Sequence, residues 1–293
     1  MDDFGIFQLL QSIKHEYGYD FSGYRKSILS RRIRLFMDHN RIPEISDLIS
    51  FITEDRSYFQ NFVDTITVNV TEIFRDPPIH RFLKEEIFPY LLSYPRVNIW
   101  SAGCSTGEEA YTLAVMIKES GLLSKTRIYA TDINSKVLNS AKEGIFNQHD
   151  ILKNTDNYFE SGGEKKLDNY YFSKYNKTIF HEDLRNIISV FSHNMTADAS
   201  FIEAQLIVCS NVLIYFNEQL QKKVLRLFHE SLCSSGFLIL GPKERVPPDF
   251  LGGYFEKVSP ELPVFRKINK AFLPAQKKTV PVKLIKDPAF CLV

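Results

Sequence analysis

The stretch Val97-Asn-Ile-Trp-Ser-Ala-Gly103-Cys-Ser-Thr-Gly107-Glu-Glu109 decides the fold of this 293-residue chain. A short apolar run ends at small residues, turns through two glycines and enters a helix marked by apolar residues between 111 and 117. Strand, tight turn and helix start are the elements with which a Rossmann-like sheet presents a nucleotide site at the carboxyl end of its first strand. The pattern predicts an α/β fold with a nucleotide at this turn.

A second apolar run, 127–131, closes on Asp132. An acidic residue at the end of the second strand is placed to accept hydrogen bonds from ribose hydroxyls. Asp132 could instead cap the next predicted helix, 134–143. The two roles are compatible, and we favour the ribose role.

The acidic pair Glu108-Glu109 bears on which nucleotide binds. A dinucleotide places its pyrophosphate against the positive end of the first helix, where these carboxylates would repel it. They suit the helix dipole and tolerate a ligand that has a cationic centre and no phosphate. S-adenosylmethionine fits that description, and NAD fits it badly.

Composition narrows the class of protein. Hydrophobic residues make up 44% of the chain and the net charge is +1, so one large and one small domain can form and nothing global indicates nucleic acid. No apolar run approaches the ~20 residues of a membrane span, and the acidic start is unlike a signal peptide. The four cysteines lack metal-ligand or disulfide spacing. We expect a cytoplasmic protein without metal or membrane insertion.

Residues 1–70 show helical periodicity throughout and predict a small all-helical domain. Its second helix concentrates positive charge, which indicates a solvated face, a surface for an acidic protein partner or, as a less favoured alternative, a site for phosphates. The basic residues of this stretch are Arg25, Lys26, Arg31, Arg32, Arg34 and Arg41.

The remaining chain divides into a sheet domain, 71–268, and a Lys- and Pro-rich tail, 269–293. Aromatic and β-branched segments between about 165 and 193 interrupt the alternation of strands and helices and predict a small antiparallel β insert. The segment 187–192 is assigned to this insert. Segments 254–258 and 264–268 are expected to form a closing hairpin.

Four blocks together resemble the CheR-type chemotaxis receptor methyltransferases: Asn69 to Asp76, Trp100 to Glu109, Ala130 to Asn134 and Asn211 to Phe216. The resemblance covers roughly residues 5–268. It implies a Rossmann-like class I methyltransferase sheet with a small β insert, preceded by an all-helical domain. Members transfer a methyl group from S-adenosylmethionine to glutamate side chains on the signalling helices of chemoreceptors and release S-adenosylhomocysteine.

The resemblance also implies roles for individual residues. Asn69, Thr71 and Arg75 would line the methyl-donor end of the site. Glu109, in preference to Glu108, would contact the methionine part of the cofactor. Asp132 would hold the ribose.

Further along the chain, Asn194 and Met195 would flank the adenine, and Asn211 with Tyr215 would wall the transfer site. Gly103 belongs to the cofactor site. Arg75 and Tyr215 are the candidate catalytic residues. Four basic residues correspond to the surface that meets acidic receptor helices: Arg25, Arg31, Arg32 and Arg34.

The chemistry suits these residue types. A glutamate side chain with a pKa of ~4.3 is already ionised at neutral pH, so its methylation needs no general base. Catalysis then depends on holding the carboxylate, methyl group and sulfur in line. Arg75 can grip the substrate carboxylate through charge-assisted hydrogen bonds, and Tyr215 can donate another. The alternative for Tyr215 is ordinary aromatic packing beside Phe216.

Three departures from the family pattern stand out. Ser210 replaces the usual Arg before the fourth block, Ala110 replaces a Pro, and Glu244 ends the motif Gly-Pro-Lys-Glu where Gly-His/Glu-Ser-Glu is common. The β insert lacks the Gly-rich loop of members that dock on a receptor-tail peptide, so we expect no such tether. Ser210 keeps a rival reading open, a weak or inactive S-adenosylmethionine-binding sensor that regulates a partner. The basic helix disfavours a small-molecule substrate.

Overall fold

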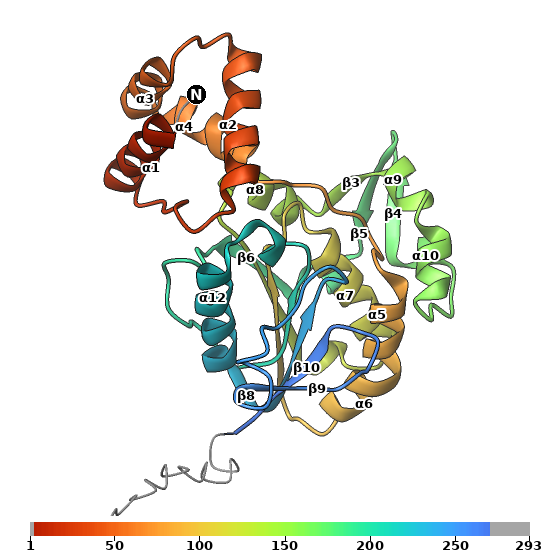
Figure 1. Ribbon diagram of the computed structural model, residues 1–293. Helices are drawn as coiled ribbons and strands as arrows, with labels where there is room; N and C mark the ends of the chain where they lie inside the picture. The colour runs from red at the N-terminus through yellow and green to blue at the C-terminus, as the bar shows by residue number, and fades with distance from the viewer. Residues whose placement is uncertain (1–2, 270–293) are drawn as a thin grey trace, which may run out of the picture.

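The computed structural model describes residues 3–269. Except for residue 269, the tail expected at 269–293 lies outside the described residues. A helical domain sits on one end of a larger α/β domain (Figure 1). None of the helices described in this range is long and apolar enough to cross a bilayer.

The helical domain packs around its own core, because apolar residues recur at helical spacing on each helix. Asp55 caps the fourth helix through a 2.7 Å hydrogen bond from the Ser57 amide. The second helix ends at Asn40, because the next residue, Arg41, has a left-handed conformation with a φ of 56°. The helices are α1 (Asp3–Tyr17), α2 (Lys26–Asn40), α3 (Ile45–Glu54) and α4 (Arg56–Ile66).

The α/β domain contains a seven-stranded sheet in the order β6-β2-β1-β7-β8-β10-β9. The first five strands of that order pair in parallel, whereas β10 pairs antiparallel with both β8 and β9. The closing hairpin expected from the sequence is therefore confirmed. The strands are β1 (Val97–Ala102), β2 (Thr126–Asp132), β6 (Ile188–Ser192), β7 (Ala204–Cys209), β8 (Leu232–Leu240), β9 (Phe255–Lys257) and β10 (Val264–Lys267).

Alternate residues of each strand face opposite layers of helices, as the strand period of two requires. Ile99 and Val208 belong to the core under α5, α6 and α7, while Trp100 and Cys209 belong to the core under α12. Figure 1 shows α12 on one side of the sheet and α5 and α7 on the other. The layers comprise α5 (Pro77–Phe82), the π-helical turn η1 (Leu83–Ile87), α6 (Phe88–Leu91), α7 (Glu108–Glu119), the 3₁₀ turn η2 (Leu123–Lys125), α8 (Ser135–Glu143) and α12 (Glu218–Ser231).

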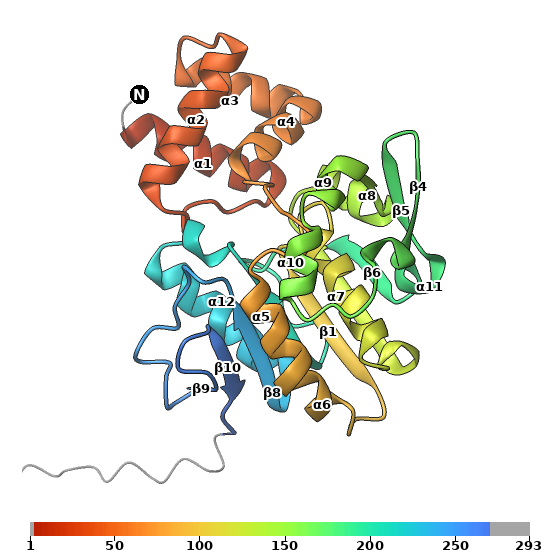
Figure 2. The same cartoon turned by 90° about the vertical axis from the view of Figure 1, so that its right-hand side faces the viewer.

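The small antiparallel sheet differs from the expected insert. Its order is β3-β5-β4, so the chain enters it already at β3 (Ile145–Asn147). The segment 187–192 does not belong to it, because β6 pairs in parallel with β2 at the edge of the main sheet. Figure 2 shows the β4–β5 hairpin projecting at the same end of the molecule as the helical domain. The other elements here are α9 (Gln148–Leu152), α10 (Thr155–Glu160), η3 (Leu167–Tyr170), β4 (Tyr171–Lys174), β5 (Lys177–Phe180) and α11 (Glu182–Arg185).

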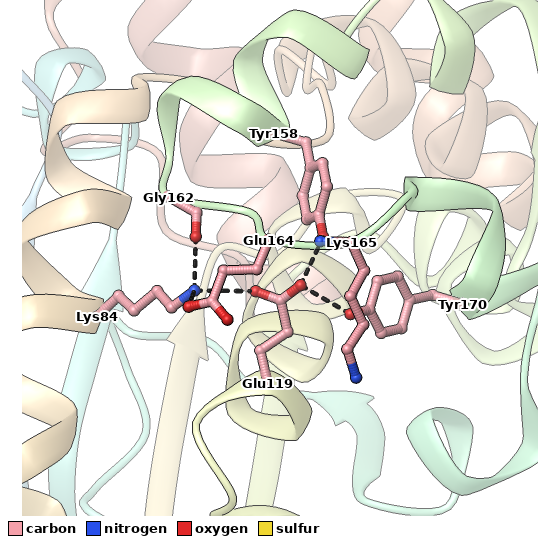
Figure 3. A network of polar contacts seen from close by, with 7 residues as sticks. All are labelled: Lys84, Glu119, Tyr158, Gly162, Glu164, Lys165 and Tyr170. Atoms are coloured by element: carbon pink, nitrogen blue, oxygen red, sulfur yellow. Dashed lines mark hydrogen bonds and ion pairs between the residues drawn. The ribbon is translucent and has the colours of Figure 1, made fainter.

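A buried carboxylate fastens this insert to the helix layer. Glu119, at the end of α7, accepts hydrogen bonds from the hydroxyls of Tyr158 and Tyr170 in the insert (Figure 3). Lys84 of η1 lies 3.3 Å from Glu119 and 2.9 Å from Glu164. The Glu119 side chain is only 4% exposed, and burial of a charge is tolerated because several donors surround it.

The strand order reverses between β1 and β7, because β2 lies on one side of β1 and β7 on the other. In open α/β sheets, ligands bind outside the carboxyl ends of the strands at such a switch point. The fold therefore places a binding site next to the turn after β1.

Candidate functional site

A cavity of about 230 Å³ opens at the carboxyl ends of β1, β2 and β7. The structure brings all ten residues predicted for cofactor binding and catalysis to its wall, and their individual roles stay predictions. They are Asn69, Thr71, Arg75, Gly103, Glu109, Asp132, Asn194, Met195, Asn211 and Tyr215. Residues of the helical domain, including Tyr24, complete the wall.

The turn after β1 has the tight geometry that its small residues predict. Gly103 has a φ of 78°, and a Cβ there would lie 2.5 Å from Val212 Cγ2. The amides of Gly103 and Cys104 both donate to the carbonyl of Thr131, at 2.8 and 2.9 Å. Glycine is therefore required at 103 both for its conformation and for its space.

Asp132 lies between two backbone amides. One carboxylate oxygen accepts from the Ser105 amide and the other from the Asn134 amide, each at 3.0 Å. Burial raises the pKa of Asp132, and these backbone hydrogen bonds counteract the shift. A carboxylate offers about four lone-pair positions, more than these backbone amides use, so the side chain can also accept from a diol. The α8 cap is supplied by Asn134, which accepts from the Lys136 amide at 3.0 Å.

The two acidic residues at the start of α7 face different cavities. Glu109 lines the main cavity, whereas Glu108 accepts from Thr106 Oγ1 at 2.6 Å and lines an adjoining pocket. Ser101 Oγ donates to Glu109 at 2.7 Å. Burial raises the pKa of Glu109 to about 7, against lowering contributions from hydrogen bonds with Ser101 and Ser210. Ser210, where the family pattern has Arg, thus contacts the Glu109 carboxylate.

The connector between the two domains presents Arg75. Phe74 anchors it, because its ring is fully buried and its amide donates to Thr112 Oγ1 at 2.9 Å. Phe74 and Asp76 both have positive φ, 53° and 60°, a conformation that costs roughly 1–3 kcal/mol for such residues. Arg75 bonds the Val70 carbonyl at 3.3 Å and is 41% exposed. Its guanidinium therefore remains available to a ligand at the cavity mouth.

Sequence reasoning gave no role to Glu244, which organises the loop after β7. Its carboxylate accepts from the amides of Gly241, Asn211 and Ile214, at 2.7, 3.0 and 3.3 Å. Asn211 has a φ of 63°, so these bonds stabilise a strained turn. In the sequence, Glu244 is visible only as a single carboxylate shortly after a buried strand. Its three backbone partners can be identified only in the folded loop.

Tyr215 follows on the same loop and is about half-buried. Burial raises the pKa of its hydroxyl, and the positive charges of Arg32 and Arg75 oppose that shift. The hydroxyl thus stays protonated at neutral pH and can donate a hydrogen bond. The positive charge of Arg75 lowers the pKa of both Tyr215 and Glu109, and all three residues line the cavity.

Residues 193–196, which include the two residues predicted to flank the adenine, form another part of the cavity wall. The Asn194 amide donates to Asp198 at 2.7 Å, and its side-chain oxygen accepts from Thr196. His193 packs edge-on against Trp100, with ring centroids 5.2 Å apart. Asn194 therefore shapes this turn, while Met195 supplies an apolar wall.

Polar groups without partners indicate that the cavity is built for a polar ligand. Within residues 3–269, buried atoms lacking a hydrogen-bond partner include Ser105 Oγ, His193 Nδ1 and Asn211 Nδ2, all in wall residues. Buried polar atoms are normally paired. Together with Asp132 for a ribose and Glu109 for a cationic group, they suit S-adenosylmethionine. Across the same residues, no cluster of His, Cys, Asp and Glu is arranged to hold a metal.

Among the residues that the structure describes, none of the four basic residues predicted for substrate binding lines the cavity. Arg31 and Arg34 are exposed on α2, and Arg32 is partly buried. Arg25 precedes the helix as its N-cap residue, and its Nε donates to the Phe216 carbonyl at 3.1 Å.

Comparison with known proteins adds to this geometry. Residues 69–259 match the family described as "CheR methyltransferase, SAM binding domain", and residues 6–67 match "CheR methyltransferase, all-alpha domain". "Putative methyltransferase Cher3" of Pseudomonas putida is 38% identical over 90% of this chain and 97% of its own length.

More distant relatives carry a functional name. A "Chemotaxis protein methyltransferase" of Listeria monocytogenes is 29% identical over 81% of this chain and 89% of its own, and one of Borreliella burgdorferi is 28% identical over 82% and 87%. A solved TehB-like SAM-dependent methyltransferase from Corynebacterium glutamicum shares 15% identity over 73% of this chain and 97% of its own. Its TM-score of 0.38 is too low to add to the family match.

Proposed function

The chain belongs to the CheR family of S-adenosylmethionine-dependent methyltransferases, and on this premise we propose that it methylates glutamate side chains of chemoreceptors. One observation carries the proposal. Arg75 and Tyr215, a cation and a protonated hydroxyl, both line the cavity that we assign to the cofactor. Such a pair suits a carboxylate substrate. The products would be a glutamate methyl ester and S-adenosylhomocysteine.

The residues of this chain would act by positioning. S-adenosylmethionine, when bound, supplies a methyl group activated by its sulfonium. Asp132 would accept hydrogen bonds from the ribose, and Glu109 would attract the positive charge of the methionine part. Asn69, Thr71 and Asn211 would line the transfer end. Orientation alone can lower a barrier by several kcal/mol.

Arg75 and Tyr215 would hold the substrate carboxylate. Both donate to an anion, and charge-assisted hydrogen bonds are about twice as strong as neutral ones. No residue needs to remove a proton, because a glutamate side chain is ionised at neutral pH. A guanidinium reduces the nucleophilicity of the carboxylate, so we assign Arg75 to positioning rather than activation.

The partner would be the acidic helices of a chemoreceptor cytoplasmic domain, which places the protein in the cytoplasm. The exposed Arg31 and Arg34 on α2 supply positive charge on the surface of the helical domain. The β4–β5 connection is a two-residue turn with positive φ at Tyr175 and Asn176, too short to form a Gly-rich docking loop. We therefore propose binding without a receptor-tail tether.

Ser210 favours one rival function, a cofactor sensor with weak or absent turnover. Because serine stands where the family pattern has arginine, this chain has one guanidinium fewer at this position, and Ser210 hydrogen-bonds with Glu109 instead. Tyr215→Phe separates the two functions, because it removes only the hydroxyl. In an enzyme we expect methyl transfer to fall about 10- to 100-fold, from the loss of a hydrogen bond to a charged group, with S-adenosylhomocysteine affinity unchanged. Methylation at the wild-type rate would remove Tyr215 from the mechanism.

A further inference from the structure

The loop that carries Tyr215 is held from outside its own domain. The segment Gly23–Arg25, between α1 and α2 of the helical domain, lies along residues 215–217. The Arg25 amide donates to the Tyr215 carbonyl at 2.8 Å, and the Asn217 amide donates to the Gly23 carbonyl at 2.8 Å. Tyr24 and Phe216 form an antiparallel bridge between these two bonds. The two domains thus share a short stretch of β pairing at the transfer site.

Side chains reinforce this pairing. Arg25 Nε donates to the Phe216 carbonyl at 3.1 Å. The Tyr24 and Phe216 rings meet edge-on with centroids 5.1 Å apart. There is no room for a side chain at Gly23, because a Cβ there would lie 2.7 Å from Leu220 Cδ2. The contact is therefore close-packed as well as hydrogen-bonded.

A second set of contacts ties the helical domain to the opposite side of the cavity. Lys136 pairs with Asp64 of α4 at 2.9 Å, and Ser135 donates to Gln60 at 2.9 Å. Ser135 and Lys136 lie three and four residues after Asp132, which lines the cavity. The helical domain is thus bonded both to the Tyr215 loop and to the start of α8, close in sequence to Asp132.

We propose that Arg25 is a positioning residue: with Gly23 it sets the loop that places Tyr215, so the helical domain completes the transfer site as well as meeting the receptor. The proposal rests on the proposed function. It changes the expectation for Arg25, which the sequence grouped with the substrate-binding residues of α2. Because α2 begins at the next residue, receptor contact on α2 is mechanically linked to the Tyr215 loop.

The test uses the full chain with receptor-containing membranes of its own cell and saturating S-adenosylmethionine. Arg25→Met removes the side-chain donor, and Arg25→Lys retains one. Gly23→Ala disturbs the same pairing without changing charge. Arg96→Met is the matched control, because Arg96 is exposed and lies just before β1, at the opposite end of the strand from the cavity.

We expect Arg25→Met to lower the maximal methylation rate about tenfold, the effect of losing one bond to a charged donor. Gly23→Ala should lower it by about 2- to 10-fold, the effect of weakening one neutral backbone hydrogen bond. S-adenosylhomocysteine affinity should be unchanged, and Arg25→Lys should recover part of the rate. In Gly23→Ala the half-saturating membrane concentration should also be unchanged. Amide hydrogen exchange at residues 213–217 should accelerate in both impaired variants.

Three results would overturn the proposal. If Arg25→Met raises only the half-saturating membrane concentration, Arg25 is a receptor contact. If the rate falls together with S-adenosylhomocysteine affinity, the pairing supports the cofactor pocket instead. If exchange at 213–217 is unchanged, the segment does not hold the loop. Wild-type protein that forms no methyl ester would refute the proposed function, and the exchange measurement would still decide on the pairing.

Discussion

Asp132→Asn gives the most direct measure of how the cavity holds its cofactor. Asp132 uses both oxygens on backbone amides, each at 3.0 Å, and we expect it to hold the ribose as well. Asparagine keeps the shape but replaces one acceptor oxygen by a donor. One backbone amide or one ribose hydroxyl must then lose its acceptor.

The size of the effect follows from these bonds. A hydrogen bond to a charged group is worth about 1.5–3 kcal/mol, and each 1.4 kcal/mol is about a factor of ten in affinity. Asp132→Asn should weaken S-adenosylhomocysteine binding by between about 10-fold and about 150-fold. The lost backbone acceptor should also lower the thermal midpoint, by about 2–4 °C for each kcal/mol.

Isothermal titration calorimetry with S-adenosylhomocysteine measures this affinity, and thermal unfolding reports the stability separately. Asp183→Asn is the matched control. Asp183 lies on α11, forms an ion pair with Lys118 at 2.6 Å and is not among the residues that line the cavity. The control should bind like the wild type. A cooperatively folded Asp132→Asn protein with wild-type affinity would refute the ribose role.

Two further predictions concern carboxylates of the site. Burial raises the pKa of Glu109 to about 7, so Glu109 loses its negative charge as the pH falls through 7. S-adenosylmethionine should therefore bind about tenfold more weakly at pH 6 than at pH 8. Glu109→Gln should flatten this profile while Glu108→Gln retains it, and a profile that survives in Glu109→Gln would assign the titration to another group. Glu244→Gln places an amide donor against three backbone amides, so it should lower the thermal midpoint and the methylation rate, and an unaltered rate would show that the loop holds its shape without the carboxylate.

The part of the site that the sequence predicted is local. The turn after β1 follows from small residues at fixed positions. At Gly103 both the positive φ and the lack of space beside Val212 exclude a side chain. Asp132 could be placed because it ends an apolar run next to that turn. Such features depend on residues within a few positions of one another, and the sequence displays them directly.

What could not be predicted depends on long-range pairing. The β6 segment has the same aromatic and β-branched character as the insert strands, and only its register with β2 assigns it to the main sheet. β3 has three residues, too few for a period to appear. Glu244 binds the amides of Asn211 and Ile214, and Arg25 binds the Phe216 carbonyl, all 30 or more positions away. The chemical nature of a Glu or Arg side chain does not indicate which distant backbone group it will bind.

The proposal that this chain makes glutamate methyl esters on chemoreceptors can be tested directly. The purified protein is incubated with methyl-labelled S-adenosylmethionine and membranes of its own cell, and the labelled protein is then treated with mild base. We expect label to enter protein and to leave as methanol, as a carboxyl methyl ester requires. Absence of incorporation while S-adenosylhomocysteine still binds would contradict it and favour the cofactor sensor.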